Sequence, residues 1–156
     1  MSLINLSHRI DSSVLPYPGD EPLRLYQNRF LEKNKYNDHR LESGMHVGTH
    51  IDSPMHLTDS KKYINEYPLD NFCGETVVLD CTAEATISYD VRFDDAVREN
   101  DIVIIRTGHE KYFGSADYFV SHPVLEMSLA EFLVSRKIKM IGMDLLLVAD
   151  HRKAPD

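Results

Sequence analysis

Apolar residues along this chain cluster in short runs, separated by polar stretches and by turns that contain glycine or proline. Such a pattern predicts a domain built mainly from short strands. Residues 101–107 are nearly all β-branched at their centre, which is typical of a strand covered on both faces. Residues 75–81 alternate between buried and exposed positions and predict a second strand. Further strands are expected over residues 3–10, 23–30, 42–52 and 138–147.

Two helices are predicted between these strands. One covers about 91–99, with Asp90 as its N-cap. The other begins at a capping box formed by Ser128 and Glu131 and continues to residue 135 or 137. Residues 30–42, between the strands predicted over 23–30 and 42–52, are predicted to form a polar loop. Mixed strands with two covering helices indicate an α/β or α+β domain.

Composition restricts the partners and the compartment. The net charge of −8 argues against a nucleic-acid or anionic-membrane partner, since either would require a basic face. No apolar run approaches the ~20 residues needed to span a bilayer, and the amino terminus lacks a signal-peptide pattern. Cys73 and Cys81 flank a predicted strand that would hold them roughly 26 Å apart, beyond disulfide reach. We therefore expect free thiols and a cytoplasmic location.

The segment His46-Val-Gly-Thr-His50-Ile-Asp52-Ser-Pro-Met-His56 carries the candidate chemistry. Imidazole and carboxylate groups are ligands of Zn²⁺ and Mn²⁺. In a strand, His46, His50 and Asp52 share one face, and Gly48 leaves that face clear between the histidines. A straight strand would place the histidine Cα atoms roughly 13 Å apart, so the chain must bend near Gly48. We predict that His46, His50 and Asp52 bind a metal.

Two points about this segment stay open. A helix would also bring His46 and His50 together, although the residues between them are poor helix formers. His56 follows the rigid turn at Pro54 and is predicted to transfer protons. It could instead be a further ligand or a hydrogen-bond donor to a ligand.

An aromatic-rich connection is expected over residues 108–125, where it forms either the wall of an aryl-substrate pocket or an arm packed on a neighbouring subunit. Asp20, in the turn after Tyr17, is either a residue of the site rim or a plain turn residue. The remaining histidines are interpreted as structural or solvated: His8, His39, His109 and His122.

The eleven-residue motif resembles that of the metal-dependent cyclase family, which includes the bacterial kynurenine formamidases, or arylformamidases. Every fixed position of His-x-Gly-Thr-His-x-Asp-x-Pro-x-His is present. Other segments also resemble the family: residues 5–10, 17–20, 102–108 and 139–144. The resemblance implies a swivelling β/β/α fold, oligomers, and amide or formamide hydrolysis at a site with one or two metals. It implies that His46, His50 and Asp52 are ligands, that Asp52 is able to bridge two ions, and that His56 is the acid/base.

One domain is expected over residues 1–156, short at its carboxyl end relative to this family. The family's terminal helix and following strand, with a further His and Glu ligand, have no counterpart, and His151 is the only histidine in that region. We therefore expect an open metal site and exposed strand edges. Exposed edges favour self-association, as a homodimer or a larger assembly.

These inferences lead to one functional hypothesis and two alternatives. We expect a metal-dependent hydrolase of an amide or formamide C–N bond, with zinc or manganese as its cofactor. The resemblance favours aryl formamides such as N-formylkynurenine, a substrate of tryptophan catabolism. The alternatives are a metal-binding or assembly protein without turnover, and a hydrolase of cyclic amides such as isatin.

Overall fold

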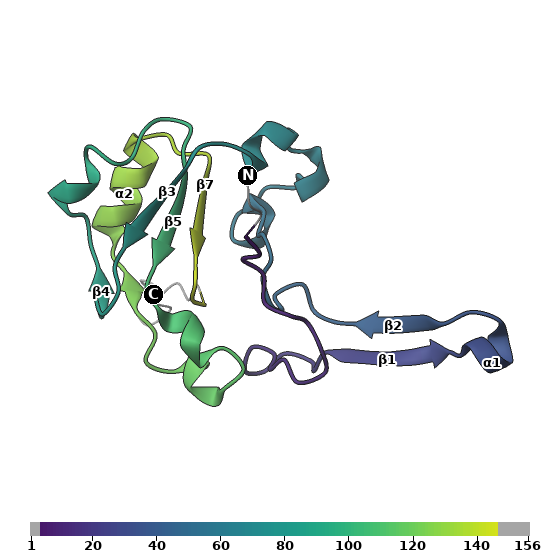
Figure 1. Cartoon of the computed structure of the whole chain (residues 1–156). Helices are drawn as coiled ribbons and strands as arrows, with labels where there is room; N and C mark the ends of the chain where they lie inside the picture. The colour runs from purple at the N-terminus through teal and green to yellow at the C-terminus, as the bar shows by residue number, and fades with distance from the viewer. Residues whose placement is uncertain (1–3, 147–156) are drawn as a thin grey trace.

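A three-stranded parallel sheet forms the centre of the structure, a computed structural model that describes residues 4–146 (Figure 1). Its strands are β3 (Thr76–Asp80), β5 (Ile102–Arg106) and β7 (Met140–Met143), in the order β3-β5-β7. The central strand β5 is the most buried of the three, as expected for a strand with neighbours on both sides.

Helix α2 (Met127–Ser135) covers one face of this sheet, and the hydrophobic core lies between them. Two short strands, β4 (Thr86–Ile87) and β6 (Val124–Leu125), pair in parallel beside the helix. The largest fully buried side chains come from this body: Ile87, Ile105, Leu129, Val97, Val103 and Cys81. The opposite face is only partly covered, since Val78 on β3 is 55% exposed.

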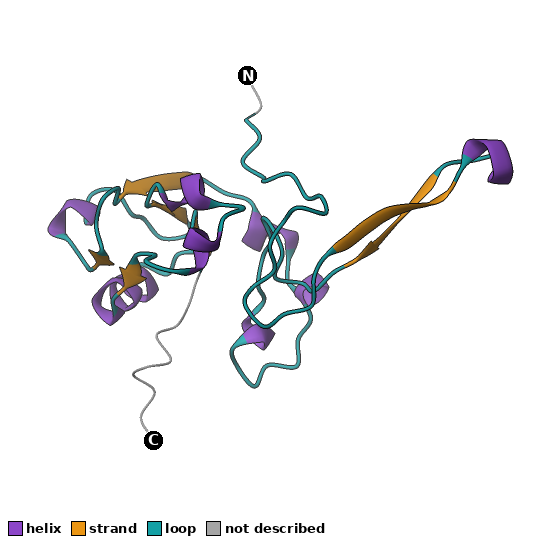
Figure 2. Cartoon of the chain, turned by 90° about the horizontal axis from the view of Figure 1, so that it is seen from below, coloured by secondary structure: helices purple, strands orange, loops and turns teal. Residues whose placement is uncertain are grey.

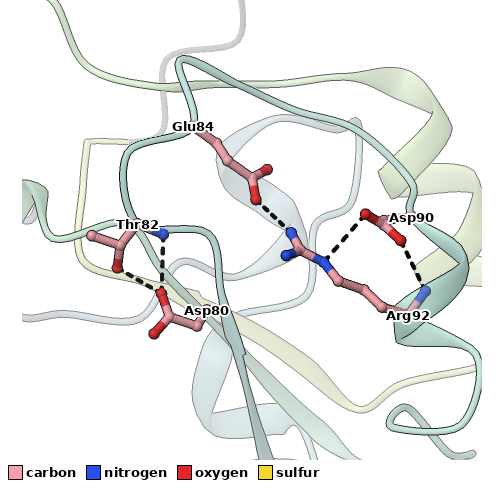
Figure 3. A network of polar contacts seen from close by, with 5 residues as sticks. All are labelled: Asp80, Thr82, Glu84, Asp90 and Arg92. Carbon is pink, nitrogen blue, oxygen red and sulfur yellow. Dashed lines mark hydrogen bonds and ion pairs between the residues drawn. The ribbon is translucent and has the colours of Figure 1, made fainter.

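Ion pairs stabilise the loop between β3 and the 3₁₀ turn Val91–Phe93 (Figure 3). The Arg92 guanidinium lies between the carboxylates of Glu84 and Asp90. Asp80 accepts hydrogen bonds from the backbone N–H and the hydroxyl of Thr82, at 3.0 and 2.6 Å. The hydrogen bonds from Thr82 lower the pKa of Asp80, which keeps the carboxylate ionised for this turn.

A two-stranded antiparallel hairpin extends away from the rest of the molecule (Figure 1 and Figure 2). It consists of β1 (Arg24–Arg29), the one-turn helix α1 (Leu31–Asn34) and β2 (Asp38–Glu42). We call residues 24–42 the arm. Between the arm and the sheet lies a lobe of loops and 3₁₀ turns, formed by residues 4–23 and 43–75.

The structure confirms the predicted strands over residues 23–30, 75–81 and 101–107, and the helix near 128–137. The predicted strand over 138–147 forms as β7, and its last residue lies outside the described part. The prediction for 3–10 is wrong, because described residues 4–10 pair with no strand. The polar loop over 30–42 is also wrong, because its second half pairs with β1 across the turn of α1.

The first predicted helix needs correction in its type and length, and the second in its start. Only the 3₁₀ turn Val91–Phe93 forms within 91–99, although Asp90 caps it by accepting from the Arg92 N–H at 2.9 Å. Helix α2 begins one residue before the proposed capping box, with Glu126 as its N-cap. The Ser128 hydroxyl instead accepts the Tyr89 backbone N–H at 3.1 Å. A long-range contact has therefore replaced the local cap.

The free-thiol expectation for the two cysteines agrees with the structure. Cys73 and Cys81 are free cysteines, and burial raises the pKa of the Cys81 thiol. Among residues 4–146, no helix has the length and apolar character needed to cross a membrane.

Candidate metal centre

The motif residues form an irregular loop that follows β2. Residues 45–49 are a series of bends, so the strand predicted over 42–52 is wrong beyond Glu42. The predicted bend is confirmed, because Gly48 has a φ of +63°, a conformation that side chains with a Cβ rarely adopt. The turn at Gly48 brings the two halves of the motif together.

Three ligand atoms form a nearly equilateral triangle in this loop. His46 Nδ1 lies 3.3 Å from His50 Nε2 and 3.1 Å from Asp52 Oδ1. The third side, from His50 Nε2 to Asp52 Oδ1, is 3.6 Å. A tetrahedral ion with bonds of about 2.0–2.1 Å holds its ligand atoms about 3.3–3.4 Å apart. The three predicted ligands therefore have the spacing that one small divalent ion requires.

A backbone hydrogen bond sets the tautomer of His50. Its Nδ1 lies 2.9 Å from the Gly48 carbonyl oxygen, which can only accept, so Nδ1 carries the proton. The Nε2 lone pair then faces the triangle, as metal-binding histidines require. The side chains of His46, His50 and Asp52 are 35%, 33% and 42% exposed, which leaves the site open to a substrate from solvent.

His56 lies beside the triangle. It ends the 3₁₀ turn Pro54–His56, which begins at the predicted rigid turn. Its ring centroid is 4.1 Å from that of His46, with the planes inclined by 41°. All four predicted site residues are thus close together, and the role of each stays a prediction.

The other histidines lie outside this group. His39 is exposed on β2 of the arm. His109 is 5% exposed, and its Nε2 lies 3.1 Å from the Tyr118 carbonyl oxygen, which makes it a structural residue. His122 and His8 pack against aromatic neighbours. His151 lies outside the described residues.

The aromatic connection packs within the chain. It contains two 3₁₀ turns, His109–Tyr112 and Ala116–Phe119. Phe113 stacks on His8, and Phe119 meets Tyr17 edge-on at 6.3 Å. The connection therefore joins the sheet to the lobe that carries the motif. Whether the connection forms a pocket wall or packs on a neighbouring subunit remains a prediction. Asp20 is exposed, and its N–H closes a turn onto the Tyr17 carbonyl.

Sequence reasoning missed Asp144 as an organising residue. Its carboxylate accepts from the Thr107 N–H and hydroxyl at 2.8 and 2.7 Å, and from the Gly108 N–H at 2.7 Å. Burial opposes ionisation, but these hydrogen bonds and a contact with the Glu110 carboxyl outweigh it and lower the pKa of Asp144. Its place directly after an apolar strand was the available signal.

The family model for cyclases matches residues 4–150, nearly the whole chain. This protein belongs to the cyclase family. The resemblance carried by the motif is thereby confirmed.

Cyclase-family relatives include kynurenine formamidases. The protein of Geobacillus thermodenitrificans is 26% identical over 144 residues, which covers 91% of this chain and 68% of that protein. The Bacillus anthracis protein is 26% identical over 145 residues, covering 90% and 67%. This chain thus spans about two thirds of the length of these relatives.

Solved structures give the same fold. Isatin hydrolase A from Labrenzia aggregata, bound to benzyl benzoate, superposes with a TM-score of 0.76 at 23% identity, covering 91% of this chain and 67% of that chain. A predicted metal-dependent hydrolase from Bacillus stearothermophilus gives a TM-score of 0.71 at 18% identity, covering 94% of this chain and 71% of that chain. These matches confirm the predicted mixed α/β fold of a cyclase-like domain. The formamidase relatives confirm the prediction that this protein is a hydrolytic enzyme.

Proposed function

We propose that this cyclase-family enzyme uses a divalent metal to hydrolyse the C–N bond of an amide or formamide. The observation that carries the proposal is the triangle of His46 Nδ1, His50 Nε2 and Asp52 Oδ1, with sides of 3.1–3.6 Å. Zinc suits this set of two imidazoles and one carboxylate, and manganese is the alternative. One ion fits the triangle. Asp52 would also help to hold a second ion.

Each site residue has a role in this mechanism. When bound, the metal supplies a polarising centre and lowers the pKa of its water toward 7. His46, His50 and Asp52 would hold it, with the Gly48 carbonyl orienting the His50 ring. His56, beside His46, would accept a proton from the attacking water and pass it to the leaving amine. That transfer allows the C–N bond to break without expelling an amide anion.

The relatives favour an aryl formamide, such as N-formylkynurenine, as the substrate. This would place the enzyme in tryptophan catabolism. The second candidate is a cyclic amide such as isatin, which the isatin hydrolase fold neighbours favour. Both substrates present an aryl group and a carbonyl bonded to nitrogen, so the same ligands and proton carrier would serve either reaction.

The third candidate is a metal-binding or assembly protein without turnover. We propose self-association in any case, as a homodimer or larger assembly, because the arm presents apolar side chains that nothing else in the described chain covers. The acidic charge disfavours nucleic acid and anionic membranes as partners. We also propose a cytoplasmic location, in keeping with the two free thiols.

Metal analysis and hydrolysis assays together test these candidates. Purified protein is expected to contain zinc or manganese, and the variants His46→Ala, His50→Ala and Asp52→Ala are each expected to lose it. His39→Ala, an exposed histidine on the arm, is the matched control and keeps the metal. The wild type is then assayed with N-formylkynurenine and isatin. Stoichiometric metal without turnover of either would favour the binding protein, and wild-type metal content in all three variants would overturn the site.

A further inference from the structure

The motif loop lacks the usual means of holding ligands in place. None of residues 43–53 is buried, and none belongs to a strand. Ligand atoms must nevertheless stay within fractions of an ångström of the productive geometry to bind a metal tightly. Contacts from elsewhere in the chain must therefore restrain this loop.

The amino-terminal segment supplies two such contacts. The backbone N–H of His8 donates to the Thr49 hydroxyl at 3.0 Å, across 41 residues of sequence. The side chain of Ile10 lies against Gly48, with Cγ1 only 3.1 Å from the position of a Cβ there. Both contacts fall directly before His50, on the residues whose conformation aims its Nε2.

The His8 side chain anchors this segment to the body of the protein. Its ring stacks on Phe113 with centroids 3.8 Å apart and planes inclined by 11°. Phe113 meets Tyr118 edge-on at 5.6 Å, and Tyr118 packs against the buried His109. His109 follows the turn that Asp144 holds at the end of β5. A continuous series of contacts thus joins the sheet to the motif loop.

We propose that His8, Thr49 and Phe113 form a clamp that positions the candidate metal ligands. Thr49 is restrained on one side by the His8 backbone, and His8 is restrained on the other by its stack on Phe113. Loss of either contact frees the loop around Gly48. Metal binding is then weaker, because the binding free energy is reduced by the entropic cost of ordering the loop. None of the three residues binds the metal, so each is a positioning residue. The inference rests on the proposed metal site and not on the proposed substrate.

The clamp is tested by metal affinity, measured by titrating the metal-free protein with Co²⁺ and with Zn²⁺. Thr49→Val removes the hydroxyl acceptor, and His8→Ala removes the stacked ring. Each is expected to weaken binding by about 10-fold, the lower end of the effect of residues that orient ligands. Thr49→Ser and His8→Phe keep the hydroxyl and the stacked ring respectively, and are expected to bind like the wild type. The visible spectrum of bound Co²⁺ reports any change in ligand geometry.

Two comparisons separate positioning from general stability. Phe113→Ala should weaken binding as His8→Ala does, and the double variant should be no weaker than either single variant, because both remove one stack. Thr76→Val, at an exposed β3 threonine whose side chain has no hydrogen bond among the described residues, is the control. The thermal midpoint of each metal-free variant shows whether folding is preserved.

The possible outcomes are distinct. Wild-type affinity in Thr49→Val and His8→Ala would overturn the clamp and leave the metal site intact. Weak binding by His8→Phe would also overturn it, because the imidazole nitrogens rather than the stack would then matter. If the affinities fall only in proportion to the loss of folded protein, the role is structural and the proposal fails. A wild-type chain that binds neither metal would overturn the clamp and the metal centre together.

Discussion

Gly48 combines a positive φ of +63° with a crowded neighbour, since a Cβ there would lie 3.1 Å from Ile10 Cγ1. The left-handed conformation costs a residue with a Cβ about 1–2 kcal/mol. Gly48 is also the carbonyl partner of His50. A strained residue here would therefore disturb the ligand triangle directly.

Gly48→Ala is expected to weaken metal binding by about 10-fold or more, because a strain of about 1–2 kcal/mol falls on the turn that orients His50. Titration of the metal-free protein with Zn²⁺ measures this. Adding Ile10→Ala should recover only the steric part and not the cost of the positive φ. Gly44→Ala is the control, because a Cβ at Gly44 meets nothing within 4 Å and its φ is not positive. Equal affinities for the two alanine variants would contradict the prediction.

His56→Ala is expected to retain the metal and lose about 10²- to 10⁴-fold in turnover, the usual contribution of a general acid–base group. The reason is its place outside the triangle but beside His46, at a centroid distance of 4.1 Å. Metal content and kcat are measured on the same preparation. Parallel loss of both would make His56 a ligand, and unchanged turnover would exclude it from the mechanism.

The close grouping of these residues could be predicted from sequence because it depends on local spacing. Two histidines four apart, a glycine between them and an aspartate two further on require a bend, and the bend is present. The tautomer of His50 and the contact from His8 to Thr49 could not be predicted. The first depends on the loop's backbone path, and the second joins residues 41 apart.

Among the elements, the junction of β5 and β7 shows how an ionised group links neighbouring strands. Asp144 follows β7, and its carboxylate holds Thr107 and Gly108 at the end of β5. The hydrogen bonds that outweigh desolvation keep the pKa of Asp144 below its usual range. For a carboxyl group whose folded pKa is depressed, the stabilisation is present above the unfolded value of about 3.9 and is lost as pH falls through the folded value.

Thermal stability is therefore expected to fall below about pH 4 in the wild type, in part through protonation of Asp144. Asp144→Asn should lower the thermal midpoint at pH 7, because an amide group can leave a backbone N–H unpaired. It should also reduce the fall in the thermal midpoint as the pH is lowered. Calorimetry between pH 3 and 7 tests this, with Asp95→Asn as the exposed control. A variant that matches the wild type at every pH would show that the junction does not depend on this charge.

Elements with a strong local pattern were predicted well, and those defined by pairing or by long-range contacts were not. Strand β5 is β-branched throughout its centre, so its sequence alone favours an extended conformation. Strand β2 has the sequence DHRLE, which carries no strand pattern and forms only because β1 pairs with it. Likewise, the helix expected over 91–99 yields to a 3₁₀ turn whose Phe93 is buried in the core.

At the scale of the whole molecule, the arm extends away from the rest of the described residues (Figure 1). Five large apolar side chains on it are 45–58% exposed: Tyr26, Phe30, Leu31, Tyr36 and Leu41. An isolated two-stranded hairpin is marginally stable in water. The arm carries five Lys and Arg and three Asp and Glu, a net charge of +2. The whole chain has 17 Lys and Arg and 25 Asp and Glu, so the residues outside the arm have a net charge of −10. The acidic body of a second copy is therefore a complementary partner.

Light scattering is expected to show a mass of at least twice 17.9 kDa for the wild type. Leu31→Glu combined with Tyr36→Glu places two carboxylates on the apolar tip of the arm and cancels the arm's net charge of +2. This variant should sediment and scatter as a monomer, because the arm loses apolar contact area and its electrostatic attraction to the acidic partner. Val134→Glu, at a 75% exposed position on α2, controls for an added surface charge and should remain associated.

A wild-type monomer at concentrations of about 100 µM, well above the dissociation constants of stable dimers, would contradict self-association. Association that survives in the arm variant would locate the interface elsewhere, with the partly open face of the sheet around Val78 as the next surface to test.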